Sequence, residues 1–413
     1  MMRKFLIFII LIFSFSPHYL YAQENDINKL QEEIMLLKSQ FEEIKTSYEK
    51  KIEQLEAKLE QLEEEEKTTA SKATQVASIQ QARNFQSFNP DVSVIGDFTT
   101  FSTDQKGDEQ YNRFNLRQAE LAFSSYVDPY ARADLFMHVE PGENEWHLGL
   151  CEGYLTLLEL PHNLQAKIGK VKANFGKINR QHLHSLPWVD YPNMLTNYFG
   201  EEGMSAPGVS ISGLLPNPWD QYIELTFEAF NNNNSTSFAS SDKKDIVYLA
   251  HLKNFFELNE KSTLEIGGSF ATGLNDDGHN KNRTNLVGID ITYKWRPLRE
   301  GLYKSLTFQN ELLVSHKNQS DGRQRIDSWG AYSSLEYKFS RRWSAFGRFD
   351  YSEFPDYSSR HDKAISLGLT FAQSEYCFWR LQFKHTNRNY DKDTNEVWLQ
   401  CNFGLGPHRA HEY

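Results

Sequence analysis

The sequence has 413 residues, of which 14% are aromatic, although its mean hydropathy is only −0.62. This combination is typical of many half-buried strands rather than of helices packed around a leucine-rich core. The net charge of −11 argues against a nucleic-acid partner, which would need a basic surface. The three cysteines follow no metal-ligand spacing, so we interpret them as small apolar side chains rather than as a disulfide between Cys377 and Cys401.

The first residues have the three parts of a secretory signal peptide. Arg3 and Lys4 are followed by the apolar run Phe5–Phe15, and Ala22 offers a small residue for cleavage. The run is too short for a membrane-spanning helix, and polar residues follow it at once. We therefore expect residues 1–22 to be a signal peptide and the mature chain to be exported.

Residues 23–67 are predicted to form an α-helical coiled coil. Between Ile27 and Leu62 the apolar residues recur at steps of three and four, and Glu and Lys fill most other positions. Such a helix buries little surface alone, so we expect it to pair with copies of itself; a lone solvated helix or docking arm is the alternative. Residues 68–90 lack this period and read as a linker.

From residue 91 to residue 413 the hydrophobic period is two. About sixteen alternating segments of roughly ten residues follow one another, which is the length and pattern of transmembrane β-strands. In the second segment the alternation slips between Leu116 and Ala119, which indicates a bulge. The segments are Val92–Phe98, Asn112–Ser125, Ala131–Val139, His147–Leu158, Leu164–Lys172, Pro207–Gly213, Gln221–Asn231, Ile246–Phe256, Ser262–Thr272, Asn285–Trp295, Lys304–His316, Asp327–Phe339, Arg342–Tyr351, Lys363–Phe371, Tyr376–Asn387 and Glu396–Gly406.

The connections between these segments are mostly short at one end and mostly longer at the other. This asymmetry is typical of an all-β transmembrane β-barrel with antiparallel strands in an outer membrane, and a soluble β-sandwich does not explain it. With an even strand count both chain ends lie on the short-turn side, so the coiled coil is expected in the periplasm. The long connections are predicted at Ser102–Tyr111, Ala173–Ala206, Asn232–Asp245, Gly273–Thr284, Lys317–Ile326 and Ser352–Asp362.

Alternation also predicts which side chains face the lumen. In the strand Tyr376–Asn387, Trp379 and Leu381 fall on one face and Arg380 and Lys384 on the other. We expect the apolar face to contact outer-membrane lipids and the polar face to line the channel, whose near-balanced charge predicts weak selectivity or a slight preference for cations. The residues predicted to line the lumen are Arg132, Asp134, Lys167, Glu224, Glu228, Arg348, Asp350, Arg380 and Lys384.

Several stretches resemble the phosphate-selective porin O and P family of Gram-negative outer membranes. They include RFNLRQAELAF at Arg113–Phe123 and AKIGKVKANFGK at Ala166–Lys177. HLHSLPWVDYP at His182–Pro192 and LGPHRAHEY at Leu405–Tyr413 are closer to a coiled-coil-bearing, uncharacterised branch of porin-like proteins. The resemblance implies a sixteen-stranded channel, a homo-oligomer that is a trimer, and a C-terminal aromatic residue, Tyr413, that the barrel-assembly machinery reads. It does not by itself imply phosphate as the solute.

Residues 173–206 interrupt the alternation with prolines, aromatics and charged residues. By resemblance to porins, this loop folds inward and narrows the channel. The residues expected to shape the constriction are Lys177, Arg180, His182, His184, Asp190, Glu201 and Glu202.

The leading hypothesis is an outer-membrane porin for passive diffusion of small hydrophilic solutes or ions. No ordered Ser, His and acid motif indicates an enzyme, and no cofactor is expected. One alternative is a structural tether that links the outer membrane to the cell wall through the coiled coil. A second alternative is metal binding or uptake, in which His182 and His184 bind zinc. For these two histidines we prefer the interpretation that they form hydrogen bonds within a packed loop.

Overall fold

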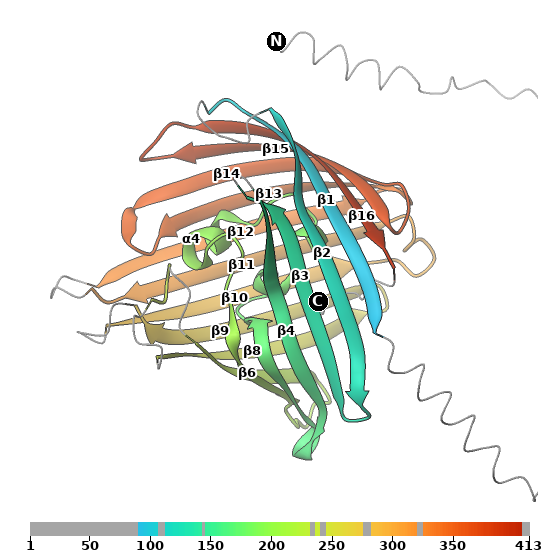
Figure 1. Ribbon diagram of the computed structural model, residues 1–413, viewed down its shortest axis with the longest axis vertical. Helices are drawn as coiled ribbons and strands as arrows, with labels where there is room; N and C mark the ends of the chain where they lie inside the picture. The colour runs from blue at the N-terminus through green and yellow to red at the C-terminus, as the bar shows by residue number, and fades with distance from the viewer. Residues whose placement is uncertain are drawn as a thin grey trace, which may run out of the picture. The chain divides into compact units, whose positions relative to one another are not determined.

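Within the residues that the computed structural model describes, sixteen antiparallel strands form a closed barrel in which β1 pairs with both β2 and β16 (Figure 1). The described residues are 90–105, 112–142, 145–231, 236–239, 245–275, 282–319 and 325–406. The closed barrel of sixteen antiparallel strands confirms that part of the predicted fold class, whereas the signal peptide, the coiled coil, almost all of the linker and the C-terminal Tyr413 lie outside these residues. None of the helices in the described ranges is long and apolar enough to cross a membrane.

The strands follow one another around the wall in chain order, and each pairs with its sequence neighbours. Their bounds are β1 Asp91–Thr103, β2 Arg113–Asp128, β3 Ala131–Pro141, β4 Trp146–Leu160, β5 Leu164–Lys172, β6 Ser205–Leu214, β7 Tyr222–Asn231, β8 Ile246–Asn259, β9 Ser262–Leu274, β10 Arg283–Trp295, β11 Ser305–Lys317, β12 Ile326–Lys338, β13 Trp343–Phe354, β14 Tyr357–Ala372, β15 Cys377–Arg388 and β16 Thr394–Leu405. The connection expected at Ser352–Asp362 is wrong: β13 and β14 extend further, and only residues 355–356 separate them.

The two faces of the wall differ as the alternation predicts. On β15, Trp379 and Leu381 are 41% and 43% exposed, whereas the intervening Arg380 is 5% exposed. A bulge interrupts β2, because the register between β1 and β2 shifts at Asp97/Phe98 and passes over Arg117. This confirms the irregularity predicted between Leu116 and Ala119.

The alternation predicts a polar inner face, but part of the inner face is apolar. On one part of the wall, inward side chains such as Phe230, Leu286 and Leu313 are 0–2% exposed and belong to one apolar cluster. Most of the rest of that cluster comes from residues 173–204, here called the inner loop, which joins β5 to β6; Phe238, from the connection between β7 and β8, also belongs to it. The inner loop therefore packs against the apolar part of the wall.

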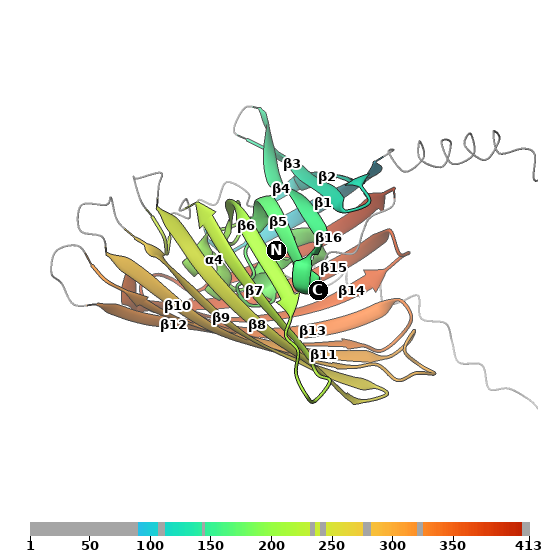
Figure 2. The same cartoon turned by 90° about the horizontal axis from the view of Figure 1, so that it is seen from below.

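The inner loop contains three short helical segments inside the ring of strands (Figure 2). They are η2 Ile178–Arg180, η3 Leu183–Ser185 and α4 Asn193–Phe199. Pro192 precedes α4, and Gly200 ends it with a φ of 88°, a conformation that glycine adopts without strain. On the facing wall, a Cβ added to Gly288 would lie 2.8 Å from the Phe175 ring, so this glycine provides the space for the loop to pack closely.

Candidate functional site

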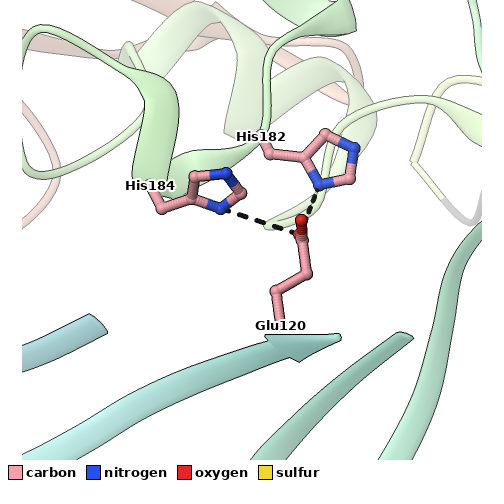
Figure 3. A group of neighbouring side chains, drawn as sticks. All are labelled: Glu120, His182 and His184. Atoms are coloured by element: carbon pink, nitrogen blue, oxygen red, sulfur yellow. Dashed lines mark hydrogen bonds and ion pairs between the residues drawn. The ribbon is translucent and has the colours of Figure 1, made fainter. Parts of the chain in front are cut away.

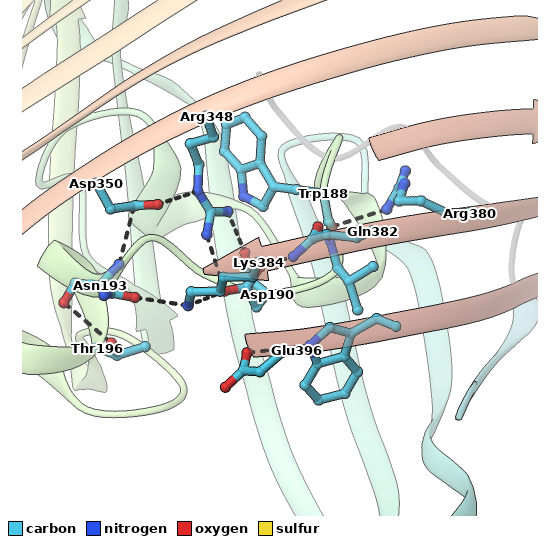
Figure 4. Close-up of polar contacts among 12 residues, drawn as sticks. Trp188, Asp190, Asn193, Thr196, Arg348, Asp350, Arg380, Gln382, Lys384 and Glu396 are labelled. Atoms are coloured by element: carbon cyan, nitrogen blue, oxygen red, sulfur yellow. Dashed lines mark hydrogen bonds and ion pairs between the residues drawn. The ribbon is translucent and has the colours of Figure 1, made fainter. Parts of the chain in front are cut away.

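One anchor of the inner loop is Asp190, whose carboxylate accepts hydrogen bonds from side chains on two strands (Figure 4). Arg348 on β13 donates at 3.0 Å, and from β15 Lys384 donates at 2.7 Å and Gln382 at 2.6 Å. Burial favours the neutral carboxyl, but the charges of Arg348 and Lys384 outweigh it and lower the pKa of Asp190 below its ordinary value. Asp190 therefore holds the loop to β13 and β15 as an ionised group.

The backbone on either side of Asp190 is held as well. Arg380 donates to the Trp188 carbonyl at 2.9 Å, and the Val189 N–H donates to the Gln382 side chain at 2.8 Å. The Trp188 ring is 1% exposed and lies 5.0 Å from the Arg348 guanidinium carbon. Apolar packing and ion pairing therefore hold the loop at the same part of the wall.

A second anchor is His182, whose ring lies between two carboxylates of the wall. Its Nδ1 is 2.7 Å from Glu120 on β2, and its Nε2 is 2.8 Å from Glu152 on β4. Burial lowers the pKa of this imidazole, but the two carboxylates outweigh burial and raise the pKa to about 9. At neutral pH His182 is therefore an imidazolium that donates from both nitrogens.

Acidic side chains of the opposite wall hold the start of the inner loop. Glu228 on β7 accepts from the Asn174 N–H at 2.8 Å, and Glu265 on β9 accepts from the Lys177 ammonium at 2.8 Å. Glu311 on β11 accepts from the Ile178 N–H at 2.7 Å. Because anchors lie on β2, β4, β7, β9, β11, β13 and β15, the loop crosses the lumen and is fixed on opposite sides of it.

Cavities remain beside the inner loop. One of about 210 Å³ and another of about 320 Å³ share Lys167, Arg180 and Ser210 in their linings. A third cavity, of about 490 Å³, is lined by Lys177, His184 and residues of β15 and β16. The loop thus leaves polar space along the wall on more than one side.

The residues predicted to shape the constriction fall into three groups according to their surroundings. Asp190, Lys177 and His182 are engaged in ion pairs with the wall, and those of Lys177 and His182 are buried. Arg180 and His184 line cavities. Glu201 and Glu202 are the only exposed residues of the inner loop, all of which is described.

The residues selected for the lumen all lie on the inner face of the wall. Asp134, Glu228, Arg348, Asp350, Arg380 and Lys384 are buried, and Arg132, Lys167 and Glu224 line the cavities. Sequence reasoning missed Glu120, Glu311 and Arg117 as contacts of the loop. Arg117 donates to the Val189 carbonyl at 2.7 Å and to Asp97 at 2.9 Å. Its inward position results from the bulge, which the slip in alternation signalled.

Two groups of side chains in the described residues could hold a metal ion. The first is Glu120, His182 and His184, which lie together in Figure 3, and its ligand atoms are within 4.8 Å of one another. The second is His138, Glu140 and Glu202, within the same limit. Of the acids near the histidines in sequence, Asp190 is engaged elsewhere; the carboxylate beside both histidines is that of Glu120.

Comparison with known proteins finds no matching family model. The chain is 27% identical to an uncharacterised protein of Aquifex aeolicus (strain VF5) over 402 aligned residues, which cover 83% of this chain and 82% of that protein.

The fold resembles solved outer-membrane proteins of very different sequence. The outer-membrane channel DcaP of Acinetobacter baumannii aligns with a TM-score of 0.51 and 11% identity, over 77% of this chain and 96% of that chain. The trimer form of OmpT, an outer-membrane protein of Vibrio cholerae, aligns with a TM-score of 0.52 and 8% identity, over 77% and 100%. These likenesses place the fold among the porin-type barrels of bacterial outer membranes.

Proposed function

We propose that this chain is an outer-membrane channel through which small hydrophilic solutes or ions diffuse passively. The observation that carries the proposal is the combination of an apolar outer face with a charged inner face and polar cavities beside the inner loop. An apolar band outside and a polar interior are what a lipid bilayer and a permeating solute require. The similarity of the fold to the outer-membrane channel DcaP and the resemblance to the porin O and P family support the same function.

The proposal includes the partners inferred from the sequence. The chain is exported by its signal peptide, inserted by the barrel-assembly machinery and assembled as a trimer in the outer membrane. The coiled coil of residues 23–67 projects into the periplasm. Similarity to the trimer form of OmpT supports the oligomer.

Purified, folded protein is expected to give discrete conductance steps in a planar lipid bilayer. The steps should be small for a sixteen-stranded barrel, because the inner loop fills much of the lumen. Heat-denatured protein from the same preparation is the control. A silent bilayer with protein that is demonstrably folded and inserted would overturn the channel function.

Selectivity is proposed to be weak, with a slight preference for anions. The near-balanced charge of the strand faces predicted weak selectivity or a slight preference for cations, but the linings of the three cavities contain eight basic and six acidic side chains. The basic ones are Arg132, Lys167, Lys172, Lys177, Arg180, Lys253, Lys294 and Arg380, and the acidic ones are Asp134, Glu152, Glu224, Glu228, Glu336 and Glu375.

Arg180→Glu is expected to shift the reversal potential in a salt gradient toward cation selectivity. Arg180 lines two of the cavities, so the substitution changes the local charge by two units where they meet. Arg341→Glu, at an exposed turn, is the matched control and should leave the reversal potential unchanged. An equal shift in both variants would show that Arg180 does not face the permeating ions.

A structural tether is the second candidate, and the dense packing of the inner loop favours it. Trp188, Tyr198 and Leu195 are 0–1% exposed inside the barrel, as in a closed plug. Deleting Ile27–Leu62 separates the candidates. A channel keeps its conductance after the deletion, whereas a tether loses its attachment to the cell wall, measured as release of outer-membrane vesicles.

A further inference from the structure

A small pocket of about 60 Å³ connects the two groups of potential metal ligands. Its lining includes His138 and Glu202 from one group and His182 from the other. In the group of His138, Glu140 and Glu202, His138 Nε2 lies 3.7 Å from Glu202 and 3.6 Å from Glu140, and the side chain of Glu140 is 47% exposed. The pocket therefore leads from partly exposed ligands to buried ones.

The buried group has the spacing of a metal site. Glu120 Oε2 lies 2.7 Å from His182 Nδ1 and 3.6 Å from His184 Nδ1. Two ligands on a tetrahedral zinc ion, with bonds of about 2.0–2.1 Å, are separated by roughly 3.3 Å. The observed distances bracket that value, so small side-chain rotations would admit the ion.

The surroundings of His182 supply the support that metal-binding imidazoles usually have. Its Nε2 donates to Glu152 at 2.8 Å, and that carboxylate also accepts the Lys172 N–H at 2.7 Å. A carboxylate on the far nitrogen fixes the orientation of the ring and makes the other nitrogen a stronger donor to a metal. Glu152 would keep this role when His182 Nδ1 binds an ion.

We propose that Glu120, His182 and His184 form a binding site for a divalent transition metal ion of the zinc type. Two imidazoles and one carboxylate suit zinc better than the hard ions Ca²⁺ and Mg²⁺, which prefer oxygen ligands throughout. The ion displaces the Nδ1 proton of His182, which is released to solvent. Water or a solute occupies the remaining position.

The site joins the inner loop to the barrel wall, because both histidines belong to the loop and Glu120 to β2. His182 lines the small pocket, whereas His184 lines the cavity of about 490 Å³, so the ion lies between two spaces. His138 and Glu202 provide the entry. Metal binding goes beyond passive diffusion and does not depend on it.

The test is a titration of the refolded full-length protein, without a histidine tag, with Zn²⁺ alone by isothermal calorimetry. We expect one ion per chain at the buried site and at least a tenfold weaker affinity in His184→Ala, which leaves the His182 contacts to Glu120 and Glu152 in place. His162→Asn removes an exposed imidazole from a turn where the backbone is left-handed and should bind as the native chain does. Heat-modifiable gel mobility verifies that each variant is a folded barrel.

Co²⁺ absorption provides a second measurement, since intense d–d bands report a tetrahedral site containing nitrogen ligands. The proposal predicts that His184→Ala and Glu120→Gln lose these bands, whereas His138→Ala retains them and only slows the rate of binding. Unchanged zinc affinity in His184→Ala would overturn the proposal. So would loss of binding in His138→Ala alone, which would place the ion at the outer group.

Discussion

Replacing residues 174–203 with Asn-Gly is expected to raise the single-channel conductance several-fold. Lys172 pairs with Ser205, and the Ala173 N–H donates to the Met204 carbonyl at 2.9 Å, so the two ends of the inner loop already form a ladder that a two-residue turn can close. Without the loop, the sixteen-stranded wall encloses an aqueous lumen. Side chains such as Arg348 and Lys384 then become hydrated instead of losing a partner in a dry interior.

Shortening the exposed loop between β15 and β16, residues 389–393, is the matched control for this deletion. It alters the same end of the barrel without touching the inner loop and should leave the conductance unchanged. Conductance that stays at the native level in a folded 174–203 deletion would show that the solute path does not pass the inner loop. The deletion also tests the tether, because a closed plug that is removed creates a channel where the native protein has none.

Asp190→Asn is expected to loosen the inner loop while leaving the barrel folded. The substitution removes the charge that pairs with Arg348 and Lys384, whose side chains are 0% and 11% exposed. Breaking a buried pair costs about 3–5 kcal/mol, and we expect the lower end because Asp190 itself is 21% exposed. Single-channel recordings should show frequent transitions to larger conductance levels. Glu201→Gln, on an exposed part of the same loop, should not add these transitions.

The same contact predicts an acid-dependent transition in the native channel. The pKa of Asp190 is lowered by Arg348 and Lys384 despite burial, so the stabilisation is complete above the unfolded value of about 3.9 and is lost as the pH falls through the still lower folded value. Gating should be constant from pH 6 to pH 5, where the His182 anchor is also at full strength because its pKa is raised from 6.5 to about 9, and it should become noisy below about pH 4. Asp350 and Glu396 also lie near Lys384, so some acid response remains in Asp190→Asn. An acid response of equal size in that variant would exclude Asp190 as its main source.

Most of the barrel could be predicted from local pattern. The period of two locates each strand and separates its faces, because neighbouring residues on a strand point to opposite sides. The ends of the strands are harder to predict, as β13 and β14 show. Both strands continue beyond the apolar alternation with polar residues, which in the sequence resemble a loop. The bulge in β2 could also be predicted, because it interrupts the same two-residue alternation that locates the strands.

The sequence by itself determined that a wall of antiparallel strands would form, which face would be apolar, and that residues 173–206 would interrupt it. Tertiary structure alone decided what the inner loop contacts. His182 meets a carboxylate 62 positions earlier in the chain, and Asp190 meets an ammonium 194 positions later. Such pairs arise from barrel closure and strand register, which bring distant strands around one lumen and leave no periodic signal in the sequence.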